Sequence, residues 1–236
     1  MLKDRWSKLP HIWTSIGLPG FSRDSTYQEY SLSLMSQIPI DLDDDLSWLT
    51  KYSEVYADQG LHQLESWVLP PASVFQIVQA KKVKLPAAFS RFMASSDLQS
   101  RVRSCTACYL DPGQRAVDTT GSLSGHLIHF LSDSQSCAHW YVHVLQSGES
   151  AVLQSEDLYC YEIENSDWIE NPACRMDRIN VEELNFHFCS PSFSEFLFRF
   201  WIENEIWFSV SRDKTKIALK EIERQYLEGI RKEPTE

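Results

Sequence analysis

The chain has 236 residues, 43% of them hydrophobic, and a formal net charge of −11. The hydrophobic content suffices for one large folded domain and excludes wholesale disorder, and no segment approaches the roughly 20 consecutive apolar residues of a membrane span. The negative charge would repel nucleic-acid phosphates and anionic membranes. Six scattered cysteines and a start without a secretory apolar run indicate a cytoplasmic protein with reduced thiols.

Residues 1–70 are predicted to form an irregular N-terminal extension that packs on the main domain. Within it, the acidic run 41–45 directly precedes an apolar stripe from Leu46 to Tyr56. Acids in this position suit a helix N-terminus, where carboxylates accept hydrogen bonds from free amides and complement the helix dipole. A cation site is the alternative, but the spacing of a calcium loop is missing. The pattern favours helix capping.

Two short helices are predicted after the break at Pro70-Pro71. Apolar residues between 74 and 80 mark the first, which ends in the basic turn 81–84. Leu85-Pro86 then opens the second, because proline is tolerated in the first turn of a helix. The buried face of this second helix is expected to consist of Phe89, Phe92 and Met93.

The middle of the chain changes to a period of two, which predicts a meandering antiparallel sheet. The expected strands are 105–110, 126–131, 138–145, 150–154 and 158–163. In the third of these strands, alternation places Trp140, Val142 and Val144 on one face of the sheet. Tyr141 and His143 are expected on the other face. We therefore expect an α+β fold, in which a mainly antiparallel sheet of about five or six strands has helices packed on one face.

A closing helix is predicted to begin at Ser192. Ser192 and Glu195 match a capping box, in which each side chain satisfies an unpaired amide of the first turn. Apolar residues follow at helical spacing and predict a broad core-facing stripe made of Phe193, Phe196, Leu197, Phe200 and Trp201. Residues 206–236 are expected to form a tail with a last amphipathic helix from about Thr215 to Ile230.

The sequence holds no strong signal for a metal or for catalysis. Cys105 and Cys108 form a CxxC pair, and Cys137 with His139 could complete a zinc site. Residues i and i+3 of a strand point to opposite faces, however, so this pair would chelate only in a turn. A redox CxxC would have to open a helix. We expect ordinary buried cysteines, no metal and no cofactor, and we keep an enzyme built on Cys137 and the sheet histidines as an alternative.

The negative charge is concentrated between residues 149 and 205, which contain thirteen acids and three bases. Such a field attracts basic protein partners, although a solvated face that maintains solubility is the simpler interpretation. If it is a binding surface, its predicted partner-binding residues are Glu149, Glu156, Asp157, Glu162, Glu164, Asp167 and Glu170.

Three segments together resemble the SUKH superfamily, the Smi/Knr-like group that includes a fungal cell-wall assembly regulator and many bacterial immunity proteins. They are residues 73–93 with Leu85-Pro86, the strand motif 140–142, and Ser192-Phe193-Ser194-Glu195-Phe196-Leu197. The resemblance covers residues 71–205, and it departs from the family in the first seventy residues, in the tail, and in the absence of a glycine near residues 95–97.

The resemblance implies a binding scaffold that is not an enzyme. In the immunity-type role it would neutralise a toxin domain, often a basic nuclease, through the acidic surface. An intracellular regulatory or scaffolding adaptor that recruits its partner through residues 1–70 is the alternative. The sequence does not predict an oligomeric state.

Overall fold

The computed structural model describes residues 5–16, 27–35, 37–56, 60–61, 69–159, 176–211 and 219–230. The strands are β1 (Ile12–Ser15), β2 (Gln28–Ser31), β3 (Tyr109–Leu110), β4 (Val117–Thr119), β5 (Gly125–Ser132), β6 (His139–Leu145), β7 (Ser150–Ser155), β8 (Arg178–Ile179) and β9 (His187–Ser190). The α-helices are α2 (Ser47–Tyr52), α3 (Val74–Gln79), α4 (Ala87–Ala94), α5 (Ser96–Gln99), α6 (Phe193–Ser211) and α7 (Glu221–Gly229), and the 3₁₀ turns are η1 (Pro71–Ser73) and η2 (Gly121–Leu123).

The main sheet has the order β8-β4-β5-β6-β7-β9, with β3 paired to β5 beside β4. Its long central strands β5, β6 and β7 are antiparallel neighbours, as predicted, while β4 and β8 pair in parallel. The α+β class and the mostly antiparallel sheet are confirmed. The described sheet has seven strands where five or six were expected, because strands as short as β4 and β8 leave no alternating pattern in the sequence.

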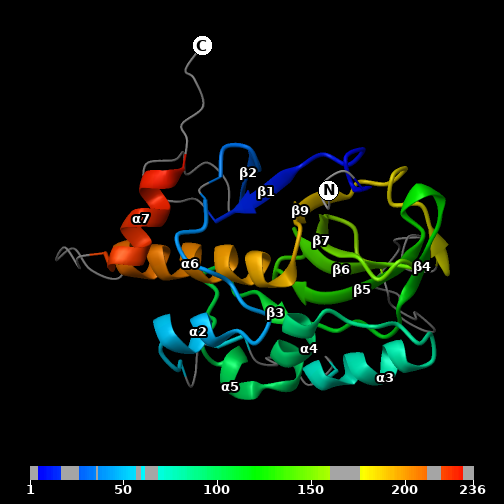
Figure 1. The fold of residues 1–236 in the computed structure, drawn as a ribbon, viewed down its shortest axis with the longest axis horizontal. Helices are drawn as coiled ribbons and strands as arrows, with labels where there is room; N and C mark the ends of the chain where they lie inside the picture. The colour runs from blue at the N-terminus through cyan, green and yellow to red at the C-terminus, as the bar shows by residue number, and fades with distance from the viewer. Residues whose placement is uncertain are drawn as a thin grey trace, which may run out of the picture.

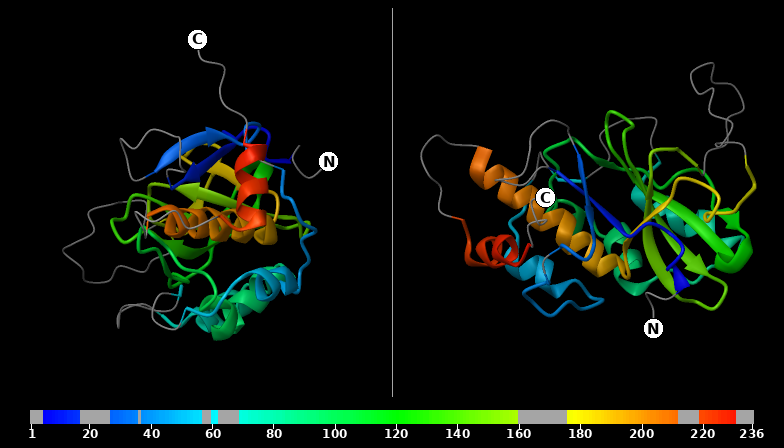
Figure 2. Two further views of the ribbon diagram at one scale, coloured as in Figure 1. Left: turned by 90° about the vertical axis from the view of Figure 1, so that its left-hand side faces the viewer. Right: turned by 90° about the horizontal axis from the view of Figure 1, so that it is seen from above.

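Helices cover one face of the sheet, as the alternation along β6 predicts. Trp140, Val142 and Val144 point into the larger core cluster, together with the aromatic faces of α4 and α6. Phe193 of α6 lies between these layers, since its ring centroid is 5.0 Å from that of Phe89 and 5.5 Å from that of Phe130. Figures 1 and 2 show α6 running between the β1–β2 hairpin and the layer of helices α2, α4 and α5.

The opposite face of the sheet is buried as well, which the sequence did not predict. Tyr141 and His143 point into a second apolar cluster made with irregular segments from both halves of the chain. Trp6, near the N-terminus, is 0% exposed and donates a hydrogen bond from Nε1 to Nδ1 of His143 over 3.0 Å. The charged surface of the protein therefore lies on the outside of these covering segments, and not on the face of the sheet.

The described parts of the first seventy residues belong to the core. Trp13 of β1 and Trp48 of α2 are each 2% exposed and lie in the same cluster as the helix-side face of the sheet. Strand β1 lies along β9, where Phe188 N donates to the carbonyl of Pro10. The division of the chain at residues 70 and 205 stays a prediction, although α6 continues through residue 205 without a break.

Four predicted element boundaries were wrong or only partly right. Strand 105–110 shrinks to Tyr109–Leu110, because residues 105–106 form a turn and Ala107 has a positive φ of 56°. Leu158 and Tyr159 are not in a strand, and 160–163 lie outside the described residues. Helix α2 ends at Tyr52, so Val55 is 52% exposed. The last helix begins at Glu221, and its predicted start at Thr215 lies outside the described residues.

Candidate functional site

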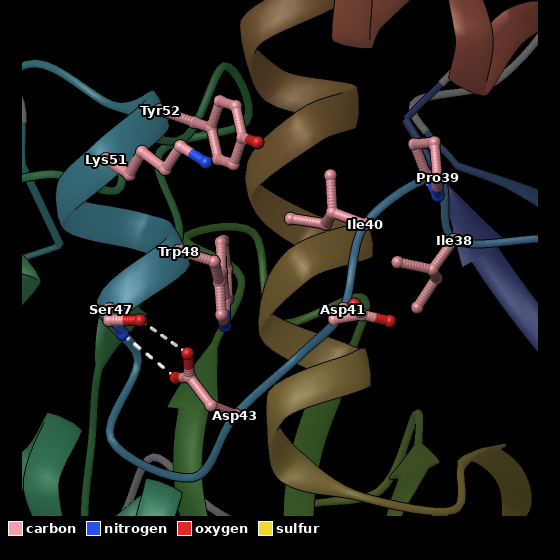
Figure 3. Close-up of a pocket in the computed structure, with 9 residues that line it drawn as sticks. All are labelled: Ile38, Pro39, Ile40, Asp41, Asp43, Ser47, Trp48, Lys51 and Tyr52. Atoms are coloured by element: carbon pink, nitrogen blue, oxygen red, sulfur yellow. Dashed lines mark hydrogen bonds between the residues drawn. The ribbon is translucent and has the colours of Figure 1, made fainter.

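A surface groove beside α2 has a mixed apolar and charged lining. We call it the α2 groove; its volume is about 510 Å³, and it is lined by Ile38, Pro39, Ile40, Asp41, Asp43, Ser47, Trp48, Lys51 and Tyr52. Figure 3 shows the two walls, which are α2 on one side and the linker 38–43 on the other, with α6 passing behind them. The linker connects the β1–β2 hairpin to α2.

The acidic run before α2 acts as the sequence predicted. The backbone amide of Ser47 donates to Oδ1 of Asp43 over 2.9 Å and to Oδ1 of Asp45 over 3.0 Å, and the Ser47 hydroxyl donates to Oδ2 of Asp43. These carboxylates satisfy an otherwise free amide at the start of the helix. The hydrogen bond from the Ser47 side chain lowers the pKa of Asp43, which is therefore ionised at neutral pH.

A relay of side chains fixes the two walls of the groove to α6. Trp48 Nε1 donates to the hydroxyl of Ser194 over 3.2 Å, and that hydroxyl donates to the backbone carbonyl of Asp43 over 3.0 Å. Leu46, between the walls, is 0% exposed and has a φ of 59°. A non-glycine residue holds this left-handed conformation only where its surroundings determine it, and here the burial of its side chain does so.

The lining of the α2 groove favours binding over chemistry. The linker contributes aliphatic side chains at Ile38 and Ile40, and α2 contributes the half-buried ring of Tyr52. The rim carries the carboxylates of Asp41 and Asp43 opposite a single ammonium group at Lys51. An apolar surface edged by charge can take a side chain or peptide segment, and the excess of carboxylates favours a basic one.

Three histidines that could serve in acid–base chemistry are buried in the sheet. Ser132 Oγ lies 3.1 Å from His129 Nε2 and 2.9 Å from His139 Nδ1, so a serine and two imidazoles do meet. Burial lowers the pKa of both histidines to about 3, and all three residues are at most 2% exposed. His143 is likewise buried, and its pKa is lowered to about 4. The surface hollows lined by residues 38–52, by residues 84–87 with 147–149, and by residues of β4 and β5 do not include any of these four residues in their linings.

The four cysteines among the described residues are not arranged as the zinc or thiol alternatives require. Cys105 and Cys108 do lie in a turn, but burial raises the pKa of Cys105 to about 12 and also raises that of Cys108, which keeps both thiols protonated. Cys137 is exposed and its thiol contacts the Gln135 carbonyl, whereas the ring of His139 faces the interior. Among the described residues, no three histidine, cysteine or acidic side chains gather at metal-binding distance.

The acidic stretch 149–205 is divided between surface and core. Of the predicted partner-binding residues, Glu156 is exposed, Glu149 is paired with Arg5 at 3.4 Å, and Asp157 is half-buried. Glu162, Glu164, Asp167 and Glu170 lie outside the described residues. Two other acids of the stretch, Glu203 and Glu205, lie on α6 and are at most 2% exposed.

Sequence reasoning identified Asp43 as a helix cap but missed the groove that it edges. The residues that could have indicated the groove are Ile38-Pro39-Ile40 and Trp48. Each of them is an ordinary apolar residue when it is considered only with its neighbours in the sequence. The groove depends on a contact between α2 and the first turn of α6, where Trp48 meets Ser194 from 146 positions away in the sequence.

Comparison with known proteins adds no family to this picture. Scans against family models, curated proteins and solved structures found no match. The SUKH resemblance therefore stays a prediction. No helix in the described ranges combines the length and apolar character needed to cross a bilayer.

Proposed function

We propose that this protein is a non-enzymatic protein-binding module whose α2 groove takes a partner segment that combines basic and apolar side chains. The observation that carries the proposal is the groove itself, in which aliphatic and aromatic walls stand beside two carboxylates of the linker. Its volume of about 510 Å³ lies within the range of pockets that hold a small ligand or a few side chains.

Charge supports a basic partner. Asp41, Asp44 and Asp45 are exposed beside the ionised Asp43, and Lys51 is the one base that lines the groove. A rim of this kind raises the rate of encounter with a cationic segment and disfavours acidic ones. The walls then supply apolar contact that charge alone does not give.

The rigid attachment of the groove supports a preformed site. Both walls are tied to α6 through Trp48, Ser194 and the Asp43 carbonyl. A site that is already in its binding geometry loses less conformational entropy when a partner docks. Because Ser132, His129 and His139 are buried and burial raises the pKa of the Cys105 and Cys108 thiols, we favour binding over catalysis.

An immunity-type role is the specific form of this proposal that the SUKH resemblance implies. The partner would then be a basic toxin domain, and the protein would neutralise it by occupying its surface. The α2 groove is a second acidic surface for such contact besides the stretch that begins at Glu149.

A peptide titration tests the proposal. The probe is a ten-residue peptide that alternates lysine with leucine, compared with the same peptide carrying glutamate in place of lysine, and binding is followed by amide chemical shifts. We expect saturable shifts in residues 38–52 with the basic peptide only. Asp41→Lys should weaken binding about 3- to 10-fold at low salt, because it replaces an attraction with a repulsion at a partly solvated site.

Glu228→Lys is the matched control, since it makes the same change in net charge on the exposed surface of α7. Tyr52→Ala tests the apolar wall without changing charge. Equal weakening by Asp41→Lys and Glu228→Lys would mean that the peptide responds only to net charge. Shifts confined to residues outside 38–52 would refute the groove as the site.

A further inference from the structure

A second hollow lies at the far end of the sheet from α7, and its lining is wholly polar apart from glycine. We call it the β4 pocket; its volume is about 370 Å³, and its lining residues are Asp118, Thr119, Thr120, Gly121, Ser124, Gly125, His126, Gln146 and Arg178. Figure 1 shows β4 and α7 at opposite ends of the molecule. A typical small-molecule site is mainly apolar, so this lining fits a strongly hydrated polar ligand.

Three charged or titratable side chains form a row across neighbouring strands at this pocket. Arg178 of β8 is in register with Asp118 of β4, and Asp118 is in register with His126 of β5. Residues opposite each other on paired strands project from the same face, so the three side chains emerge together. Lys81, just beyond α3, reaches the same place from the helix layer.

In this row, the carboxylate has an oppositely charged partner among the described residues and the guanidinium has none. Oδ1 of Asp118 accepts hydrogen bonds from both Lys81 Nζ and His126 Nδ1, the latter over 3.1 Å. The single carboxylate is therefore satisfied by its neighbours. The guanidinium of Arg178 is exposed, and within the described ranges it has neither an ion-pair nor a hydrogen-bond partner. Among the described residues, the pocket thus presents a positive group that no carboxylate neutralises.

Two glycines form part of the floor of the pocket, each at a position where the backbone requires glycine. A Cβ atom on Gly125 would lie 2.2 Å from the carbonyl oxygen of Val144, and Gly121 has a φ of 78°, which side chains rarely adopt. The hydroxyls of Thr120 and Ser124 and the amide of Gln146 surround this floor. A ligand in the pocket therefore meets backbone and small polar groups, with the arginine at one side.

We propose that the β4 pocket binds a small anionic molecule through an oxyanion, either a phosphate or a carboxylate, with Arg178 as the principal contact. A guanidinium presents parallel N–H groups that match the two oxygens of such an anion. The hydroxyl of Ser124 and the side-chain NH₂ group of Gln146 are the donors that can add hydrogen bonds from the other side. The remainder of the pocket has room for a polar body with hydroxyl groups, for which Asp118 and Gln146 supply acceptors.

Titration of the full-length protein with inorganic phosphate and, separately, with acetate tests the inference in 150 mM chloride. We expect saturable changes in amide shifts at Thr120, Ser124 and Arg178. The anion that binds more tightly, phosphate or acetate, shows which kind of oxyanion the pocket prefers. Arg178→Ala should weaken binding about 10- to 100-fold, which is typical of losing a charge-assisted contact. Arg91→Ala, at an exposed arginine of α4, is the matched control and should leave the affinity unchanged.

Ser124→Ala separates a built site from a loose ion cloud, because it removes one hydroxyl of the lining that has no hydrogen-bond partner among the described residues. A built site loses affinity in this variant, and its unfolding temperature without ligand stays close to that of the wild type. Equal loss in Arg178→Ala and Arg91→Ala, or shifts that do not saturate, would mean an adventitious ion only and would overturn the proposal.

Discussion

The side chain of Glu203, buried in the middle of α6, allows a direct test of how the core tolerates charge. Its Oε1 accepts hydrogen bonds from Trp13 Nε1 over 2.8 Å and from the Tyr226 hydroxyl over 2.9 Å, and its Oε2 accepts one from Ser15 over 2.9 Å. Burial raises the pKa of this carboxyl from 4.5 to about 7, even though these donors and Arg199 oppose the shift. The perturbation that tests this environment is Glu203→Gln.

The sign of the pH effect follows from the direction of the shift. Between pH 4.5 and 7 the unfolded chain releases the proton of Glu203 while the folded chain keeps it, so the wild type loses stability as the pH rises through this window. A shift of this size corresponds to about 3 kcal/mol in the free energy of unfolding. Glutamine carries no titrating proton, and so it removes the loss.

Glutamine also fits the hydrogen bonds that glutamate makes. Its carbonyl oxygen at the Oε1 position accepts from Trp13 and Tyr226, and its NH₂ group donates to the hydroxyl of Ser15. We therefore expect Glu203→Gln to match the wild type near pH 4.5 and to be more stable by about 3 kcal/mol at pH 7.5. Urea unfolding followed by fluorescence across this pH range measures the difference.

Glu205, two residues further along α6, supplies the control. It accepts two hydrogen bonds from Arg103, at 2.8 and 3.0 Å, and one from the Tyr56 hydroxyl at 2.8 Å. Glu205→Gln leaves the buried guanidinium without its counter-charge and should cost about 3–5 kcal/mol. The reasoning is refuted if the two glutamine variants lose similar stability at pH 7.5.

Three further predictions concern the core. Acidification from pH 6.5 through 4 should destabilise the protein by up to about 3 kcal/mol through His143 alone, since its folded pKa is lowered to about 4 and the unfolded chain takes up the proton first. His143→Asn should remove this share and make the loss of stability less steep in urea titrations, while His129 and His139 keep their own contributions. Phe196→Ala should cost about 3–5 kcal/mol in calorimetry, whereas Val55→Ala, at an exposed side chain, should change stability by less than about 0.5 kcal/mol. Deleting residues 1–70 removes three buried tryptophans and should abolish the cooperative unfolding transition; a truncated chain that still unfolds cooperatively would contradict the core described above.

The truncation result also bears on how an adaptor role is tested. Deleting residues 1–70 would separate an adaptor from a toxin-neutralising protein only if the remainder folded by itself. Because Trp6, Trp13 and Trp48 complete the core, loss of binding in that deletion would report unfolding. Substitution of single exposed residues, such as Asp41→Lys, avoids this ambiguity.

Local pattern predicted the elements that local contacts determine. Ser192 Oγ accepts from the amide of Glu195 over 3.1 Å, and the apolar stripe that follows along α6 is buried, as its spacing indicates. The alternation along β6 likewise identified the helix-side face correctly. In each case the periodicity of one segment is enough, because neighbouring residues of that segment share one buried face.

Features that depend on long-range contact could not be predicted in this way. The second face of the sheet is covered by Trp6, which meets His143 across 137 positions of sequence. Glu203 and Glu205 were counted with the acidic surface because burial of a charge depends on donors from other elements, such as Trp13 and Arg103. The α2 groove likewise depends on a long-range contact, which is the hydrogen bond from Trp48 to Ser194.

Amide hydrogen exchange of the intact protein, with and without the basic alternating peptide, tests the central claim most directly. Binding in the α2 groove predicts slower exchange in residues 38–52 and unchanged exchange around Glu149 and Asp157. Protection confined to residues 149–159, or to α7, would contradict the assignment of the groove as the binding surface.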